Sequence, residues 1–496
     1  MAQEPNSMRK RHKRRQAMEQ QRLAEQKRLK RNLLIALIVL AFTGLLIWTI
    51  AQDVSGGKKP EKEEEALQET VQTFPTAPTG EETEPPVNPH DPRHKPVTKI
   101  HIRAGGDINV TTDVVDSGKT GNKYDYTKAF IDVQSLLADA DLTLLNFEGS
   151  ICGEPYGTET RSAPPELLTG LVNAGVDMLQ TANSYSIYNG LIGMTATLQS
   201  VKNAGLISVG AYSTPSEYER TKGYTIVDVQ GVKVAFVAFT KGLGGMGMPA
   251  GNEDCVNLLY EDYDDTYQKI NTKKITKVLR AAAAEKPDIT IALLHWGSEY
   301  NDTISESQLR IEELMMEEGV SVIIGSHPHT VQKISFDQEK NTLVAYSLGD
   351  FYGDASRAGT NYSIILDIEI TKDEGAGTTK VTDFSYFPIY TLSQFEREEK
   401  NSVKKQVMRI GSAMDAREGN FVDRITGDAY KSMEYSLSRI SDRVRGVDEE
   451  REKQKELEEN GLLPKKKKKK KDEETAPTGE TTVETTGLDT ASTPTE

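Results

Sequence analysis

Hydrophobic positions form two distinct patterns along the chain. The first is an unbroken uncharged run of 18 residues at 33–50, LLIALIVLAFTGLLIWTI, close to the ~20 apolar residues that a helix needs to cross a ~30 Å hydrocarbon core. Eleven Lys and Arg residues precede it within residues 1–32, and basic flanks favour the cytoplasmic side of a membrane. We therefore predict a transmembrane helix over 33–51, a basic cytoplasmic N-terminus over 1–32, and the rest of the chain on the outer face of the cell membrane. The alternative is a cleaved signal peptide, but the run is long and no clear A-x-A site follows it.

The second pattern covers residues 97–395, where short apolar runs alternate with amphipathic stretches. We expect strands at 99–104, 142–149, 176–184, 206–211, 288–297, 320–329, 342–351 and 361–370, and a hairpin over 225–240 that turns at Gln230-Gly231. Helices are expected at 128–139, 166–174, 195–204, 271–285 and 305–318. Repeated alternation of helices with apolar strands predicts a layered α/β domain.

The segments on either side of this domain differ from it in amino-acid composition. Eight of the 20 prolines fall between Pro60 and Pro96 among Glu and Thr, which is typical of an extended acidic linker over 52–96 that buries too little apolar surface to fold. After the domain, residues 396–460 are predicted to form a peripheral helical segment. Residues 461–496 are low in complexity and hold the lysine run Lys465–Lys471. That run is either a solvated tail or a point of adhesion to anionic wall polymer or lipid.

Charge and cysteine content exclude several classes of protein. The chain has a net charge of −15; residues 1–32 carry eleven basic and three acidic residues, or +8, so the other residues carry −15 − 8 = −23. A duplex-binding protein needs a folded basic face, and we expect no nucleic-acid partner. Two cysteines exclude a disulfide-rich scaffold and a Cys-based zinc module. Cys152 and Cys255 are available for a disulfide outside the cell, but nothing in the sequence pairs them.

Polar residues follow the carboxyl ends of several predicted strands, which is where ligands bind in open α/β sheets. These residues are Asp107, Asn109, Glu148, His295, His327 and His329. In extended backbone the two histidines of His327-Pro328-His329 would face the same side. Each residue alone has an ordinary structural interpretation, as a turn residue, a solvated charge or a buried histidine. Together they supply the carboxylate and imidazole ligands that suit a divalent metal of borderline softness.

Six motifs in order carry a family resemblance: GDIN at 106–109, NFEGS at 146–150, TANSYSIYNG at 181–190, HWGSEY at 295–300, GSHPHTVQ at 325–332 and YSLGDFYG at 346–353. They resemble the CapA family of bacterial capsule synthesis, or poly-γ-glutamate biosynthesis, proteins. The domain of that family is similar to the calcineurin-like metallophosphatases. The resemblance covers about residues 97–370 and implies a four-layer α/β/β/α sandwich.

The resemblance also implies a metal site for one or two divalent ions, of manganese, zinc or iron. The implied ligands are Asp107, Glu148 as the bridging carboxylate, His295, His327 and His329, with Asn109 where related phosphatases often have a histidine. The third motif departs from the family pattern, because Ser184 stands at the usual ligand asparagine and Tyr185 at the usual catalytic histidine. Asn183 is the candidate to replace the missing ligand. Asp350 stands where the family usually has asparagine.

Two functions follow from the resemblance. The first is a membrane-anchored extracellular protein of capsule or poly-γ-glutamate-type polymer biosynthesis, with a metal-dependent hydrolase-like domain. The second is a catalytically degenerate member that binds or tethers the anionic surface polymer or its synthesis and export machinery. A third hypothesis is a surface protein whose histidines are only structural. The GLGGMG stretch at 242–247 matches G-x-G-x-x-G, but no helical pattern follows it, so we predict a loop near the site and no dinucleotide.

Overall fold

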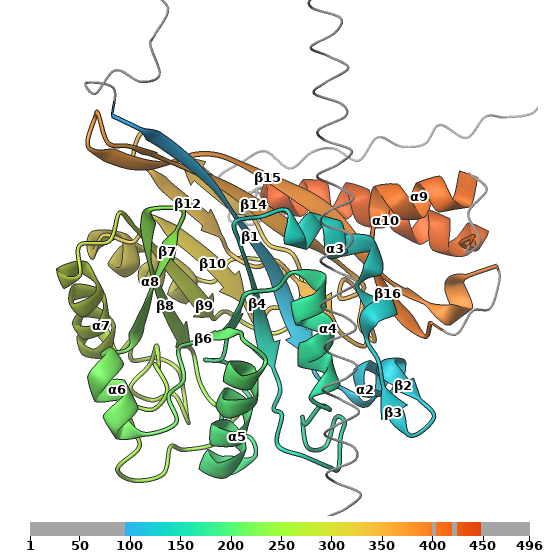
Figure 1. The fold of residues 1–496 in the computed structure, drawn as a ribbon, viewed down its shortest axis with the longest axis horizontal. Coiled ribbons are helices and arrows are strands. Elements are labelled where there is room, and N and C mark those ends of the chain that lie inside the picture. Colours follow the sequence, from blue (N-terminus) through green and yellow to red (C-terminus); the bar gives the residue numbers. More distant parts are fainter. Residues whose placement is uncertain (1–94, 399–402, 419–423, 448–496) are drawn as a thin grey trace, which may run out of the picture. The chain divides into compact units, whose positions relative to one another are not determined.

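The computed structural model describes residues 95–398, 403–418 and 424–447 (Figure 1). The chain divides into two compact units, Met1–Val87 and Asn88–Glu496, and every described residue belongs to the second. The predicted segments 1–32, 33–51 and 461–496 lie outside the described ranges, as does the linker 52–96 apart from its last two residues. No helix within those ranges is both long and apolar enough to cross a membrane.

The first sheet has the strand order β16-β15-β14-β1-β4-β5-β6, and β13 pairs with the end of β1. From β1 to β6 the neighbours are parallel, whereas β14, β15 and β16 are antiparallel to their neighbours. The strands are β1 (Val97–Asn109), β4 (Leu142–Glu148), β5 (Met178–Gln180), β6 (Ile207–Val209), β13 (Asp350–Tyr352), β14 (Tyr362–Asp373), β15 (Thr378–Ser393) and β16 (Lys405–Arg409).

The second sheet has the order β11-β12-β10-β9-β8-β7, with a parallel centre of β8, β9, β10 and β12. The predicted hairpin is confirmed, because β7 and β8 pair antiparallel on either side of Gln230-Gly231. The strands are β7 (Tyr224–Val229), β8 (Val232–Thr240), β9 (Ile289–His295), β10 (Val322–Ser326), β11 (Ile334–Asp337) and β12 (Thr342–Ala345). A separate two-stranded ribbon is formed by β2 (Lys119–Thr120) and β3 (Lys123–Tyr124).

Three buried clusters show how the two sheets and the helices are layered. The largest lies between the sheets, where Ile102 of β1 packs in the same cluster as Phe236 of β8 and Leu293 of β9. A second cluster covers the outer face of the first sheet with helices α3 (Ile131–Ala138) and α4 (Glu166–Ala174). A third covers the second sheet with α7 (Thr272–Ala284) and α8 (Glu306–Glu317). The order is therefore helix, sheet, sheet, helix (Figure 1), which confirms the predicted α/β class and its four layers.

The helices and 3₁₀ turns lie mostly on the outer faces and edges of the sheets. They are α2 (Thr112–Gly118), η1 (Thr127–Ala129), α3 (Ile131–Ala138), α4 (Glu166–Ala174), α5 (Gly190–Asn203), α6 (Pro215–Thr221), α7 (Thr272–Ala284), α8 (Glu306–Glu317), η2 (Gln394–Glu396), α9 (Ile410–Glu418) and α10 (Gly427–Val444). Local capping explains where some of these helices begin. Ser305 is the N-cap of α8 and forms a capping box with Gln308, which satisfies two backbone donors.

Residues 396–460, predicted as a peripheral helical segment, contain a strand as well as helices. Strand β16 pairs with β15 and extends the first sheet beyond the predicted domain end at 395. Ile410 in α9 and Met433 and Ile440 in α10 are buried in the cluster between the sheets. These helices contact β14 and β15, and their apolar side chains therefore continue the central core over that end of the first sheet.

Strand β1 carries an irregularity that determines where Asp107 points. Its pairing with β4 shifts between Ala104 and Asp107, which is the signature of a bulge. Gly106 makes the bulge possible, because a Cβ atom there would lie 1.7 Å from the carbonyl oxygen of Gly349. Asp107 is thereby placed opposite Asn146 on the inner face of the sheet and also pairs with Asp350 of β13.

Candidate metal centre

The inner faces of both sheets change from apolar to polar at their carboxyl ends. Along β4, Leu142 and Leu144 face the central core, and the same face continues with Asn146 and Glu148, since side chains alternate along a strand. The alternation in β9 likewise brings His295 onto the core face, after Ile291 and Leu293. All of these side chains are buried. The site therefore lies between the two sheets at the carboxyl ends of their strands, where polar side chains continue the face that is apolar in the central core.

Asn146 is at the centre of this polar layer. Its Nδ2 atom donates a hydrogen bond to Asp107 Oδ1 at 2.7 Å and lies 3.3 Å from Glu148 Oε1. The same nitrogen lies 3.4 Å from His295 Nδ1, and that ring nitrogen lies 3.3 Å from Glu148 Oε1. One amide therefore fixes two carboxylates and one imidazole of the predicted ligand set.

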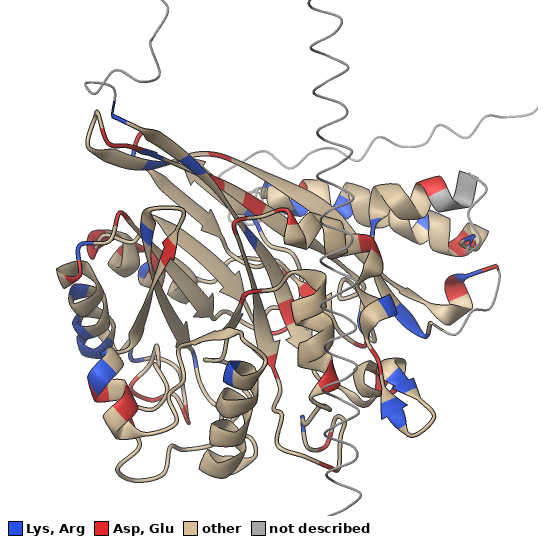
Figure 2. Ribbon diagram, viewed as in Figure 1, with Lys and Arg blue, Asp and Glu red and all other residues tan. Residues whose placement is uncertain are grey.

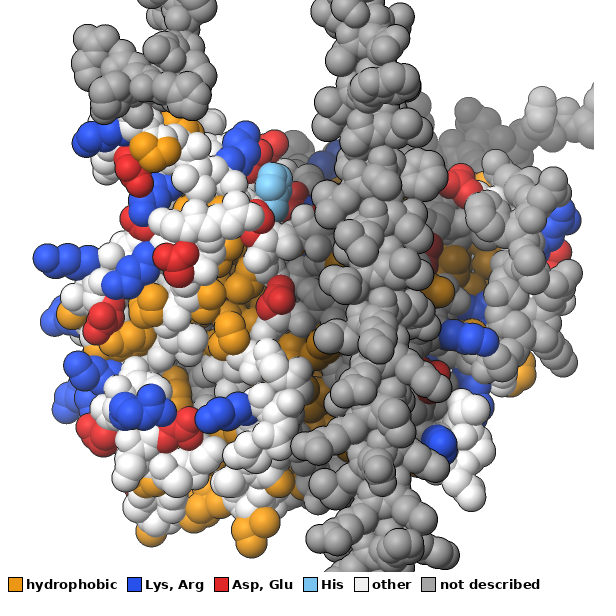
Figure 3. All heavy atoms as spheres, viewed as in Figure 1, with side chains coloured by type: hydrophobic (Ala, Val, Ile, Leu, Met, Phe, Trp, Pro, Cys, Tyr) orange, Lys and Arg blue, Asp and Glu red, His pale blue; other side chains and the backbone are white. Residues whose placement is uncertain are grey.

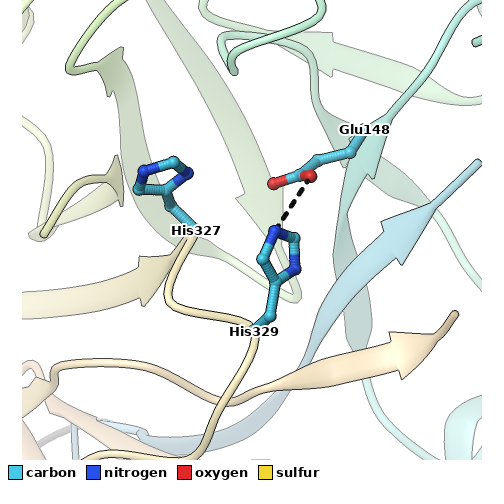
Figure 4. A group of neighbouring side chains, drawn as sticks. All are labelled: Glu148, His327 and His329. Atoms are coloured by element: carbon cyan, nitrogen blue, oxygen red, sulfur yellow. Dashed lines mark ion pairs between the residues drawn. The ribbon is translucent and has the colours of Figure 1, made fainter. Parts of the chain in front are cut away.

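His327 and His329 approach Glu148 from the loop after β10, and the three side chains face a common space in Figure 4. Our expectation of an extended backbone here is wrong: His327 has φ of +92° and His329 of +57°. A turn in the left-handed region therefore brings the two imidazoles together, with ring centres 6.2 Å apart. Such strained non-glycine conformations cluster at functional sites.

Asp350 orients His329. Its Oδ1 atom lies 2.7 Å from His329 Nδ1, and the other ring nitrogen, Nε2, lies 3.7 Å from Glu148 Oε2 (dashed in Figure 4). A carboxylate on one nitrogen of a histidine holds the other nitrogen ready for a metal. The sequence reasoning did not place Asp350 among the ligands, although it ends the stretch YSLGD and is the first residue of β13.

The side chains present fit a divalent cation. Three overlapping groups have ligand atoms within 4.8 Å of one another: Glu148 with His327 and His329, Asp107 with Glu148 and His295, and Asp107 with His329 and Asp350. Glu148 Oε2 is buried without a hydrogen-bond partner and lies 3.7 Å from His329 Nε2, and a buried polar oxygen that lacks a hydrogen bond is costly unless it binds a cation. The carboxylates all come from strands of the first sheet, whereas the imidazoles come from the end of β9 and from the loop after β10, both in the half of the sandwich formed by the second sheet.

Burial sets the protonation of most of these groups. It raises the pKa of Asp107 to about 6, and it raises the pKa of Glu148 well above its usual value. It lowers the pKa of His295 and of His327 well below the usual value. Both imidazoles are therefore neutral near pH 7, which is the form that binds metal ions.

His329 differs from the other two histidines. Burial alone would lower its pKa, but the neighbouring carboxylates, with Asp350 first, outweigh burial and raise it well above the usual value. Burial in turn raises the pKa of Asp350, and His329 opposes that rise. The excess of buried negative charge at this corner is therefore partly offset by a proton, which a cation would replace.

The two predicted asparagine ligands have their amide oxygens engaged in protein hydrogen bonds. Asn109 Oδ1 accepts a hydrogen bond from Arg161 Nη1 at 2.7 Å. Asn183 Oδ1 accepts one from the backbone N–H of Tyr185 at 3.0 Å, and its Nδ2 donates to Phe147 O at 2.6 Å. Asn109 and Asn183 therefore border the cluster and support its neighbours in this structure.

Ser184 and Tyr185 stand at the corner where the sequence departs from the family pattern. Ser184 Oγ lies 3.0 Å from His295 Nε2. The ring of Tyr185 lies under the Arg161 guanidinium at 4.2 Å, and burial raises the pKa of its hydroxyl to about 12. A phenol with such a pKa is a weak proton donor near neutral pH.

A pocket of about 350 Å³ opens beside this corner. It is lined by Ser184, Tyr185, Lys241, Gly242, Gly244, Tyr267, Ser298, Glu299 and His327. The predicted loop at 242–247 therefore borders the site, and no helix follows it before α7. The two cysteines do not pair: Cys152 is exposed, whereas Cys255 is buried in the central core.

Comparison with known proteins identifies the family. The fold is a layered α/β sandwich whose buried carboxylates and imidazoles are able to bind metal. The family model of bacterial capsule synthesis protein PGA_cap matches residues 101–355, which is more than half of the chain. The chain belongs to this family.

Two curated relatives agree with that assignment. Capsule biosynthesis protein CapA of Bacillus anthracis is 26% identical over 324 residues, covering 64% of this chain and 75% of the relative. PGA biosynthesis protein CapA of Bacillus subtilis is 28% identical over 258 residues, covering 50% of this chain and 63% of the relative. Among solved structures, the calcineurin-like phosphoesterase YfkN from B. subtilis aligns with a TM-score of 0.37 at 18% identity, covering 70% of this chain and 97% of that one.

Proposed function

We propose that this chain is a membrane-anchored protein of capsule or poly-γ-glutamate-type polymer biosynthesis whose domain works as a divalent-metal-dependent hydrolase-like centre on the outer face of the cell. Residues 33–51 would be the anchor, and the anionic surface polymer or its synthase components would be the partner. The observation that carries the proposal is the buried cluster of carboxylates and imidazoles around Glu148 Oε2, an oxygen that accepts no hydrogen bond from the described residues. Family membership supports the biosynthetic role.

In this proposal each residue of the centre has a separate role. Asp107, Glu148, His295, His327 and His329 would hold the ion, and Asn146 and Asp350 would orient them. A bound divalent cation supplies charge neutralisation and polarisation of a phosphoryl or carboxyl oxygen. The neutral His295 and His327 present lone pairs to the ion, and the pocket beside Tyr185 leaves room for the anionic group of a substrate.

The first test is metal content. Full-length chain, purified with detergent and equilibrated with Mn²⁺, Zn²⁺ or Fe²⁺, should retain one or two ions after desalting, because the cluster has ligands for that number. His329→Ala should lose at least one of them. His101→Ala is the matched control, since His101 lies on β1 beside Asp367 and outside the cluster. Wild-type chain that retains no divalent ion would overturn the proposal.

One observation favours the second function, a catalytically degenerate member that only binds polymer. Tyr185 lies where the family has its catalytic histidine, and burial keeps its hydroxyl protonated. The double variant Ser184→Asn, Tyr185→His supplies an imidazole, whose unperturbed pKa of ~6.5 suits proton transfer. We expect it to hydrolyse bis(p-nitrophenyl) phosphate at least tenfold faster than wild type, within the range that general acid–base groups contribute.

The outcomes of that assay separate the two functions. Activity found only in the double variant supports the binding-only member. Activity in wild type that His327→Ala abolishes supports the hydrolase-like centre and rules out a member that only binds. A double variant no faster than an active wild type would show that Tyr185 does not limit turnover. Metal content measured on each variant shows whether a loss of activity accompanies a loss of the ion, which is the result expected for the proposed ligand His327.

A further inference from the structure

Three cations beside the cluster are each held against a tyrosine ring. The pairs are Arg161 on Tyr185 with the guanidinium 4.2 Å from the ring centre, Lys241 on Tyr267 at 4.7 Å, and Arg357 on Tyr300 at 4.2 Å. Among the described residues none of the three cations forms an ion pair within 4.0 Å. A guanidinium stacked on a ring keeps N–H donors at its edge free for an anion.

The three pairs adjoin the cluster at different places. Tyr300 stacks on His329 with ring centres 5.4 Å apart, and its backbone N–H donates to Pro328 O. Lys241 lines the pocket that also contains His327 and Tyr185. The cations come from three loops, after β4, β8 and β13. The site therefore has positive groups on the pocket side and on the His329 side.

Arg161 is held in an unusual backbone conformation. Its φ is +50°, the left-handed region that disfavours most non-glycine residues. Two hydrogen bonds from Ser150, donated by its backbone N–H and by its hydroxyl, fix the Arg161 carbonyl. The side chain then reaches Asn109 Oδ1 and Val110 O through Nη1 alone. A strained residue that points a cation at a buried cluster indicates a role in binding.

We propose that Arg161, Lys241 and Arg357 are three anion-binding residues around the cluster of carboxylates and imidazoles. They would bind a linear polyanion whose successive negative groups lie on the pocket side and on the His329 side of the cluster. The inference deepens the proposed function by naming the residues that select its ligand. A single small anion would reach one of these places, whereas a chain of separate negative groups reaches several at once. Each contact would be a charge-assisted hydrogen bond.

The competing location for a polyanion is helix α7. Figure 2 marks several Lys and Arg positions in blue along this helix, and blue side chains project from the same edge in Figure 3. Lys277 of α7 is exposed and also lies over a tyrosine ring, 5.6 Å from the centre of Tyr218. α7 covers the outer face of the second sheet, so Lys277 is a matched control: a cation on a ring, outside the cluster.

The experiment measures binding of a labelled oligoglutamate and of a labelled polyphosphate by fluorescence anisotropy, in the presence of Mn²⁺. All proteins are full-length chains in a background where Lys465–Lys471 are glutamine, because that run would bind any polyanion. The variants are Arg161→Asn, which tolerates a left-handed backbone, Lys241→Gln and Arg357→Gln. Each should weaken binding about tenfold, the loss of one charged hydrogen bond. Lys277→Gln should leave binding unchanged, and Arg161→Lys should retain most of it.

Each outcome decides a separate point. The triple variant, which combines Arg161→Asn, Lys241→Gln and Arg357→Gln, should retain its metal, because none of the three residues is a predicted ligand. Unchanged polyanion binding by this metal-loaded variant would overturn the inference. Loss of binding on Lys277→Gln alone would place the polyanion on α7 and would also overturn it. If the wild-type chain holds no metal but binds the polyanion, and the three substitutions weaken that binding, the proposed function would be wrong and this inference would remain supported. Preference for oligoglutamate or for polyphosphate identifies the source of the negative groups.

Discussion

Replacing Glu148 with glutamine should both remove metal binding and make the metal-free protein more stable. The carboxyl is fully buried and burial raises its pKa well above the usual value, so at neutral pH the ionised form costs folding free energy. Glutamine has nearly the same shape and no charge. We expect the unfolding free energy of the chelator-treated protein to rise by about 1–3 kcal/mol, of the order of the desolvation cost that is removed.

The same substitution should weaken cation binding by about a hundredfold or more, since even the supporting partners of a metal ligand typically contribute 10–100-fold. Thermal melts with and without Mn²⁺ measure both effects: wild type should gain melting temperature on adding the ion, and Glu148→Gln should not. Glu159→Gln is the control, because Glu159 is exposed. A variant that keeps the full metal-dependent gain would show that Glu148 does not hold the ion.

Asp107→Asn should change the pH dependence of stability in the metal-free protein. Burial raises the pKa of Asp107 from 3.8 to about 6 in the folded state, so the folded protein holds this proton more tightly than the unfolded one. Its contribution to stability is fully present below about pH 4 and is lost as the pH rises through 6. Asparagine lacks this loss. The variant should therefore gain on wild type by about 3 kcal/mol between about pH 3 and pH 7, a range that brackets both pKa values, because these differ by about two units, each worth about 1.36 kcal/mol.

Chemical denaturation at a series of pH values, with a chelator present, measures the difference between the two proteins. Differences are needed because His295 and His327, whose pKa values are lowered, make stability fall in the opposite direction, towards acid. Asp265→Asn, on the exposed loop before α7, should run parallel to wild type at every pH. A constant offset between Asp107→Asn and wild type would mean that the Asp107 proton is held equally in both states.

The sequence predicts the α/β class and the strand-end residues because both depend on local periodicity, whereas the number of layers came from the family resemblance. Glu148 and His295 each end a buried apolar run, and the parallel centres of the sheets bring those ends together. Asn146 was within reach of the same reasoning, since it lies two residues before Glu148 and shares its face. The motif order then led to the correct family.

Other parts of the site depend on contacts between distant segments. Asp350 contacts His329, and Arg161 contacts Asn109, only because separate segments of the chain meet in the fold. Hydrophobic periodicity in the sequence does not predict such contacts. The convergence of His327 and His329 depends on a left-handed turn that the sequence-based interpretation of an extended HPH missed. Strand β16 was not predicted, because it is a short edge strand in a stretch whose other residues have helical patterns.

The division of ligands between the sheets has a mechanical consequence. Carboxylates project from the first sheet, and imidazoles project from β9 and from the loop after β10 in the half formed by the second sheet. An ion bound to both would therefore join the two halves of the sandwich. Sliding or parting of the sheets would then break coordination bonds, and partial opening of the domain would become a loss of metal. Loading should therefore slow amide hydrogen exchange in the centres of both sheets together, including β14 and β10, which lie outside the ligand set.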